Sequence, residues 1–183
     1  MLTPGSRQRG VTMAEVMMVV AIVAVLMAIG VPSLQSWLAK SRLQLKTEAV
    51  LNGMQFARGE ALRRNARVFY TLGTDSSWSV GCVNLVADND GDGVADCPVL
   101  IQAKPAAEGG AGVVVAITPT AATTATFNAL GLIAANADAS AAITQVDFSV
   151  TGSTQTYRVL LSSGGQSRLC DPAVTTTGDP RLC

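Results

Sequence analysis

An apolar run near the N-terminus constrains this chain more than any other feature. Every residue from Val16 to Val31 is apolar or glycine. With Val11 to Met13 the run reaches about 20 mostly apolar residues, and a helix of that length roughly spans the hydrocarbon core of a bilayer. One acid, Glu15, interrupts the run. The sequence therefore predicts a membrane-spanning helix with a carboxylate near its start.

A secretory signal peptide is the first alternative, because Arg7 and Arg9 precede the apolar run like the basic start of such a signal. Two features oppose it. No small-x-small cleavage site followed by a mature start stands out after Gly30, where a helical pattern resumes. A carboxylate in hydrocarbon is also costly unless it is neutralised or paired. Glu15 therefore indicates a partner, the alternative being a hydrated position at the membrane interface.

The stretch Arg9-Gly10-Val11-Thr12-Met13-Ala14-Glu15 resembles the prepilin peptidase site, whose usual form is Gly-Phe-Thr-Leu-x-Glu before an apolar helix. The resemblance implies that Gly10 ends a leader peptide and that Val11 is the N-methylated first mature residue. It also implies that Glu15 pairs with the N-terminal amine of a neighbouring subunit during filament assembly. Two apolar replacements depart from the pattern, Val11 for Phe and Met13 for Leu.

Residues 33–65 continue the helical pattern. Apolar residues recur there at spacings near three and four: Leu34, Leu38, Leu45, Ala49, Met54, Ala57, Ala61 and Leu62. This stripe predicts a helix that packs under a sheet. The other face is basic, and either stays solvated or meets lipid headgroups and acidic patches of neighbouring subunits. Pro32 falls where type IV pilins often kink or melt the helix.

The run from Ala57 to Asn65, Ala-Arg-Gly-Glu-Ala-Leu-Arg-Arg-Asn, resembles the Ala-Arg-Ser-Glu-Ala-x-Arg-Arg stretch of the FimT/GspH group of minor pilins and pseudopilins. The resemblance implies a subunit of a type IV pilus or of a type II secretion pseudopilus. It implies a single-pass protein of the bacterial inner membrane with a cytoplasmic N-terminus and a periplasmic head. The expected partners are other pilin or pseudopilin subunits, prepilin peptidase and inner-membrane lipid.

The region after Arg67 has short β-prone runs separated by turn residues. The expected strands are 68–72, 78–86, 99–103, 113–118, 124–127, 143–150 and 156–162, with a hairpin turn at 151–154. The predicted fold class is α+β, a long N-terminal helix packed on a small antiparallel sheet or two. The expected organisation is a leader (1–10), a transmembrane half of the helix (11–32), an amphipathic half (33–66) and an extracytoplasmic β-rich head (67–183).

The chain from Val68 onward, which makes up nearly all of the predicted head, is acidic, with a net charge of −6 from four basic and ten acidic residues. This charge opposes binding of nucleic acid over a broad face. The chain has no histidine, and its sequence has no soft-ligand metal cluster, nucleophile elbow or phosphate loop. We therefore expect a non-enzymatic protein.

The four cysteines form two local pairs in the sequence, Cys82 with Cys97 and Cys170 with Cys183. An even number of cysteines suits disulfides in an oxidising compartment. Three connectivities are possible, of which the local one is expected. The alternative, four free thiols in a cytosolic protein, conflicts with the predicted membrane segment.

The segment from Asp88 to Asp96, Asp-Asn-Asp-Gly-Asp-Gly-Val-Ala-Asp, places carboxylates at alternate positions. Such a pattern can wrap a hard cation, and it matches the first half of an EF-hand loop. The segment also resembles the calcium loops of thrombospondin repeats. The candidate calcium ligands are Asp88, Asp90, Asp92 and Asp96. The EF-hand's closing glutamate is missing, and the alternative is a polar hairpin connection.

The C-terminus resembles the FimT ending, a strand followed by Gly-Arg-x-Arg, Cys, Asp, Pro and a final Cys. In some FimT proteins the basic motif binds DNA during natural transformation, so a DNA-binding minor pilin is the alternative function. Here Gln166 replaces the first arginine of the motif, which leaves Arg168, with Arg181 as a second candidate. One or two cations give weak, salt-sensitive binding. The other interpretation is that Arg168 only decorates an edge strand.

Overall fold

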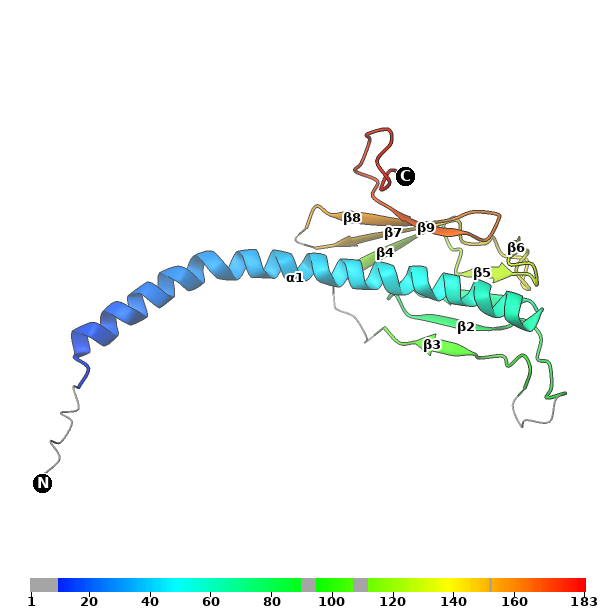
Figure 1. The fold of residues 1–183 in the computed structure, drawn as a ribbon, viewed down its shortest axis with the longest axis horizontal. Helices are drawn as coiled ribbons and strands as arrows, with labels where there is room; N and C mark the ends of the chain where they lie inside the picture. The colour runs from blue at the N-terminus through cyan, green and yellow to red at the C-terminus, as the bar shows by residue number, and fades with distance from the viewer. Residues whose placement is uncertain (1–9, 90–94, 107–111, 152) are drawn as a thin grey trace, which may run out of the picture. The chain divides into compact units, whose positions relative to one another are not determined.

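The protein is described by a computed structural model that covers residues 10–89, 95–106, 112–151 and 153–183. The chain divides into two compact units, Met1–Leu38 and Ala39–Cys183. A single helix, α1 (Met13–Arg64), contributes residues to both units (Figure 1).

In the first unit, the start of α1 is capped by Thr12. The Glu15 N–H donates to the Thr12 hydroxyl at 3.3 Å and the Val16 N–H donates to the Thr12 carbonyl at 3.2 Å. Thr12 is thus the N-cap residue, which satisfies amides that have no partner within the helix. Described side chains from Met13 to Val31 are exposed. Among the described residues, α1 is the one helix that is long and apolar enough to cross a membrane.

In the second unit, α1 ends at Arg64 because Asn65 turns into the left-handed region with φ 49°. The Ala66 N–H then donates to the Ala61 carbonyl at 3.2 Å. This is a Schellman ending, and asparagine tolerates its backbone conformation better than most residues. The reversal leads the chain directly into the first strand.

Five strands form the first sheet, in the order β3-β2-β1-β5-β6 with every pair antiparallel. Their bounds are β1 (Val68–Leu72), β2 (Trp78–Cys82), β3 (Gln102–Lys104), β5 (Thr124–Phe127) and β6 (Ile133–Ala134). Alternate residues of β1 are buried, namely Val68, Tyr70 and Leu72. One face of this sheet therefore packs in the core and the other faces outward.

Four strands form the second sheet, in the order β4-β7-β8-β9 and again antiparallel. Their bounds are β4 (Val113–Thr118), β7 (Gln145–Val150), β8 (Thr156–Leu161) and β9 (Ser167–Cys170). The predicted turn at 151–154 connects β7 and β8, although residue 152 lies outside the described residues. The fold is the predicted α+β fold of a helix on antiparallel sheets.

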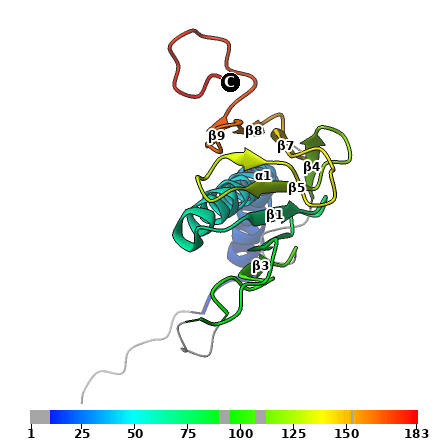
Figure 2. The ribbon, with the colours of Figure 1, turned by 90° about the vertical axis from the view of Figure 1, so that its right-hand side faces the viewer.

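One hydrophobic core joins α1 to both sheets. In Figure 2 the helix lies against β1 and β5, with β7, β8 and β9 above it. The helix contributes Leu43, Val50, Met54, Ala57 and Ala61, each at most 1% exposed. Gly53 also belongs to this face, because a Cβ there would lie 2.9 Å from the Tyr70 ring.

The predicted apolar stripe of the helix is partly wrong. Leu34, Leu45 and Leu62 are exposed. The buried face instead includes Lys46 and Thr47. Lys46 Nζ donates to the Ala106 carbonyl at 3.0 Å and the Thr47 hydroxyl donates to the Leu43 carbonyl at 2.8 Å. Buried polar groups are tolerated when they are hydrogen-bonded, so hydrophobicity alone misassigned this face.

Four of the predicted strands have other bounds in the structure, the smallest change being the run 156–162, which ends as β8 at Leu161. The run 78–86 ends as a strand at Cys82, and the run 99–103 corresponds to Gln102–Lys104. Beyond Cys82 the chain leaves the ladder and returns through an isolated bridge between Val86 and Cys97. The predicted run 143–150 begins as a strand only at Gln145, and β6 and β9 were not among the predicted runs.

Candidate functional site

The predicted cleavage and assembly residues lie at the start of α1. Gly10 and Val11 are exposed and precede the helix. Glu15 lies in the first turn, three residues after the N-cap Thr12, which is the spacing of a capping box. A carboxylate there faces the positive end of the helix dipole. Pro32 lies inside α1, which has helical residues on both sides of it.

The C-terminal turns of α1 carry a cluster of charged residues centred on Glu60. Glu60 is 8% exposed, and its Oε2 accepts hydrogen bonds from Arg63 Nη2 and Arg64 Nε, both at 2.7 Å. The hydrogen bond from Arg63, and then that from Arg64, holds the pKa of Glu60 below its usual value despite the opposing effect of burial. Arg64 also donates to the Asp96 carbonyl. The cluster thus fixes the end of the aspartate-rich loop to the helix.

Arg58 connects α1 to the turns of both sheets. Its Nε donates to the Gly131 carbonyl at 3.0 Å. A Cβ at Gly165 would lie 1.9 Å from that same Gly131 oxygen, so the β8–β9 turn is in direct contact with it. The Ile133 N–H then donates to the Ser163 carbonyl at 3.1 Å. The run from Ala57 to Arg64 therefore organises the head.

The roles of Arg58, Glu60 and Arg64 in the fold are not among the predictions from the sequence. The Ala-Arg-Gly-Glu-Ala-Leu-Arg-Arg run could have indicated the ion pairs within the helix, because its charges recur three and four residues apart. The tertiary acceptors, the Gly131 and Asp96 carbonyls, are main-chain atoms far away in the chain. Only the fold brings them to the helix.

The candidate DNA-binding residues Arg168 and Arg181 both have oxygen partners. Arg168 Nη2 donates to the Cys183 main-chain oxygen at 3.1 Å. Arg181 forms an ion pair with Asp179 at 2.8 Å, which lowers the pKa of Asp179 and raises that of Arg181. The nearby Arg158 pairs with Asp147 at 2.6 Å. The two ion pairs offset positive charge of Arg158 and Arg181 that could otherwise bind phosphate, and DNA binding stays a prediction.

The candidate calcium loop is described only at its two ends. Asp90 and Asp92 lie outside the described residues. Asp88 is exposed, and Asp96 Oδ2 accepts a hydrogen bond from Asn89 Nδ2 at 2.8 Å. Within the described part of the chain, no group of three or more acidic, cysteine or histidine side chains is placed to hold a metal. Calcium binding stays a prediction.

The two disulfides are local. Cys82–Cys97 and Cys170–Cys183 close segments with sequence separations of 15 and 13 residues. The first closes the base of the aspartate-rich loop. The second anchors the C-terminal segment to β9, beside the isolated bridge between Asp171 and Leu182. Both loops carry exposed polar residues that the bridges hold close to the head.

Comparison with known proteins identifies two sequence families. The family model described as type II transport protein GspH matches residues 46–168, more than half of the chain. The model described as prokaryotic N-terminal methylation motif matches residues 5–31. No match is found among curated proteins.

Two solved structures resemble the fold. Both are crystal forms of the type IV minor pilin FimU of Pseudomonas aeruginosa strain PAO1. The P21 form has a TM-score of 0.51 at 18% identity, over 75% of this chain and 95% of that chain. The P65 form has a TM-score of 0.48 at 17% identity, over 73% and 97%. The first of these similarities shows a common fold.

Proposed function

Because this chain belongs to the family of the type II transport protein GspH, we propose that it enters a filament through its N-terminal helix after prepilin processing. It is a minor pilin or pseudopilin of a type IV pilus or a type II secretion pseudopilus, and it is a structural protein, not an enzyme. The observation that carries the proposal is the methylation motif followed at once by the exposed apolar part of α1.

Processing occurs between Gly10 and Val11, and Val11 is then methylated. Both residues precede α1 and are exposed, so a peptidase reaches this peptide bond without unwinding the capped helix. The partners at this stage are prepilin peptidase and the inner-membrane lipid around residues 11–32. The N-terminus is cytoplasmic, and residues 67–183 form the extracytoplasmic head.

Assembly follows when the apolar side chains of α1 leave lipid and pack on the helices of other pilin subunits. Glu15 pairs with the new N-terminal amine of a neighbouring subunit, which neutralises a carboxylate that is costly in an apolar environment. Thr12 keeps the first turn formed through its hydrogen bond to the Glu15 N–H. Pro32 allows the helix to bend within the filament.

The test is the intact mass of the membrane-extracted full chain, from cells with and without a prepilin peptidase. We expect loss of Met1–Gly10 and gain of one methyl group only when the peptidase is present. A full-length mass in both cells, or cleavage near Gly30, contradicts the proposal.

A second arm of the test separates processing from assembly. Glu15→Ala should be processed but excluded from sheared filaments, whereas Glu48→Gln, which changes another acid of α1, should enter them. Filaments that contain Glu15→Ala at the wild-type level contradict the role of Glu15.

A further inference from the structure

The outward face of the five-stranded sheet carries a groove that none of the roles above uses. Its volume is about 290 Å³. Side chains of β1 and β5 that point away from α1 form the floor, among them Phe69, Thr71 and Thr124. Val99 lies on one wall and Asp138 on the other. The groove is therefore apolar and hydroxyl-lined, with a carboxylate at its rim.

Both walls are fixed by the fold. On one side the Val99 backbone crosses Gly81 so closely that a Cβ at Gly81 would lie 1.7 Å from the Val99 oxygen. On the other side the Asn136 amide donates to the Thr124 carbonyl at 3.1 Å and its Oδ1 accepts from the Thr126 hydroxyl at 2.9 Å. A groove held in this way loses little entropy when it is occupied.

Asp138 gives the rim its charge. Its Oδ1 accepts hydrogen bonds from the Ser140 hydroxyl at 2.7 Å and the Ser140 N–H at 3.0 Å, which lower the pKa of Asp138 and keep it ionised at neutral pH. No cation in the described part of the chain lies within ion-pair distance of it. An occupant that matches the groove presents an apolar side chain beside a cation.

The chain carries such a surface on its own helix. Five of the basic residues between 33 and 67 bond to oxygen atoms. Lys46, Arg58, Arg64 and Arg67 donate to main-chain carbonyls of the head, and Arg63 donates to Glu60 on α1 itself. The other two, Lys40 and Arg42, are exposed and have no ion-pair partner among the residues that the structure describes. Leu45 is 59% exposed and follows Arg42 by three residues, so both lie on one helix face.

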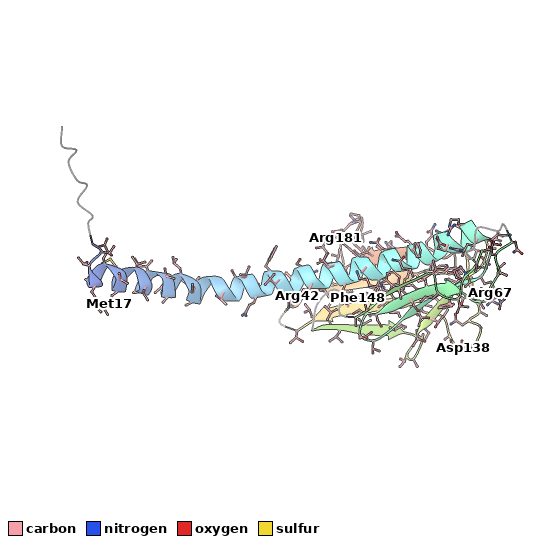
Figure 3. The ribbon with its side chains drawn as sticks, turned by 90° about the horizontal axis from the view of Figure 1, so that it is seen from below. Met17, Arg42, Arg67, Asp138, Phe148 and Arg181 are labelled. Carbon is pink, nitrogen blue, oxygen red and sulfur yellow. A yellow bond between two sulfur atoms is a disulfide. The ribbon has the colours of Figure 1, made fainter. Side chains whose placement is uncertain are left out.

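Arg42 and Asp138 lie towards opposite ends of the second unit, Asp138 near Arg67 (Figure 3). A contact between them therefore joins two molecules and is staggered along α1. We propose that the groove binds the Arg42–Leu45 face of α1 from a second copy of this chain, with Arg42 facing Asp138. The inference rests on the proposed function as a filament subunit. Because the two surfaces differ, the contact is heterologous and does not close into a two-fold dimer.

The test is photocrosslinking of the full chain in the source organism, with p-benzoylphenylalanine in place of Thr71 on the groove floor. We expect a crosslinked product of twice the subunit mass, joined to the α1 peptide that contains Leu45. Asp138→Arg and Arg42→Asp should each lower the yield about threefold or more, because each opposes like charges. The Asp138→Arg/Arg42→Asp double variant should restore it.

A matched pair of variants controls for the local turn. Asp75 makes the same turn as Asp138, since its Oδ1 accepts from the Ser77 hydroxyl at 2.6 Å and the Ser77 N–H at 2.9 Å. Asp138→Asn should lower the yield and Asp75→Asn should not. No crosslink, a crosslink to a different protein, or no rescue by the double variant overturns the inference. Removal of Met1–Gly10, measured on the same sample, shows whether the proposed function fails with it.

Discussion

At the scale of single residues, Gly165 makes the closest contact of the glycines around Arg58. It brings the β8–β9 turn against Gly131 in the β5–β6 turn. Gly165 has φ +73°, and a Cβ there would lie 1.9 Å from the Gly131 carbonyl oxygen that Arg58 also binds. Only a residue without a side chain fits both the backbone conformation and the space. This contact is one of the points at which the two sheets and α1 meet.

Gly165→Ala should therefore lower the free energy of unfolding by about 2 kcal/mol or more, because the new methyl group displaces the Gly131 turn and the left-handed backbone is strained. Gly164→Ala is the matched control, since its Cβ would meet only the Ser162 hydroxyl at 3.7 Å. The measurement is urea unfolding of both variants in detergent. Equal midpoints would show that the turn adapts.

Glu60 makes the stability of the head depend on pH. Its folded-state pKa is lowered from 4.5, chiefly by the hydrogen bond from Arg63. The stability it contributes is present above the unfolded pKa and is lost as pH falls through the lowered folded value. Unfolding midpoints of wild type and Glu60→Gln should therefore differ at pH 7, and the difference should shrink as pH falls below 4.5. A Glu60→Gln difference that does not shrink contradicts this account.

At the scale of elements, the hydrophobic pattern of α1 does not by itself identify which of its residues are buried. The buried face of its second half runs through Leu43, Val50, Met54, Ala57 and Ala61. Leu45 belongs to the stripe expected from the sequence, yet it is exposed. Met54→Ala should cost about 2–5 kcal/mol and Leu45→Ala at most about 0.5 kcal/mol. Thermal unfolding of the two variants measures the difference, and similar losses would place Leu45 in the core.

The sequence predicts the strands that lie as β-prone runs between turn residues, and it fails where main-chain contacts between distant segments set the bounds of a strand. The bounds of β1, β4 and β5 were predicted correctly. The segment after Cys82 is as β-prone as a strand, but the crossing of Val99 over Gly81 and the Cys82–Cys97 bridge take it out of the ladder. Contacts between main-chain atoms that are distant in sequence do not depend on side-chain type, so no local pattern of residues predicts them.

The same contrast holds for the candidate site. The motif around Gly10 and Glu15 is local, so it could be recognised from the residues alone. The tertiary acceptors of Arg58 and Arg64 lie 73 and 32 residues away, and the partner of Arg168 is a main-chain oxygen. Arginines that could bind a ligand, judged from the sequence alone, therefore form hydrogen bonds within the head.

At the scale of the whole molecule, the placement of charge bears on DNA binding. Residues 68–183 carry a net charge of −6, and Arg158 and Arg181 face Asp147 and Asp179. The full chain in detergent should bind duplex DNA only at low salt and release it near about 0.15 M. Asp179→Asn should strengthen the low-salt binding by releasing Arg181, and Asp75→Asn should not. Fluorescence anisotropy measures both, and salt-resistant binding abolished by Arg168→Ala would establish the alternative function.

The joint core of α1 and the two sheets also sets the order of events in synthesis. The helix face with Leu43 and Met54 is made first, while Val159 and Leu161, which share its core, emerge near the end of the chain. Contacts between residues so far apart in the sequence form slowly, because the entropy of closing a long loop is lost before the contacts stabilise the fold. Insertion of the apolar half of α1 into the membrane can therefore precede folding of the head. Because Val159 and Leu161 belong to this core, the head can complete its packing only after β8 has been synthesised.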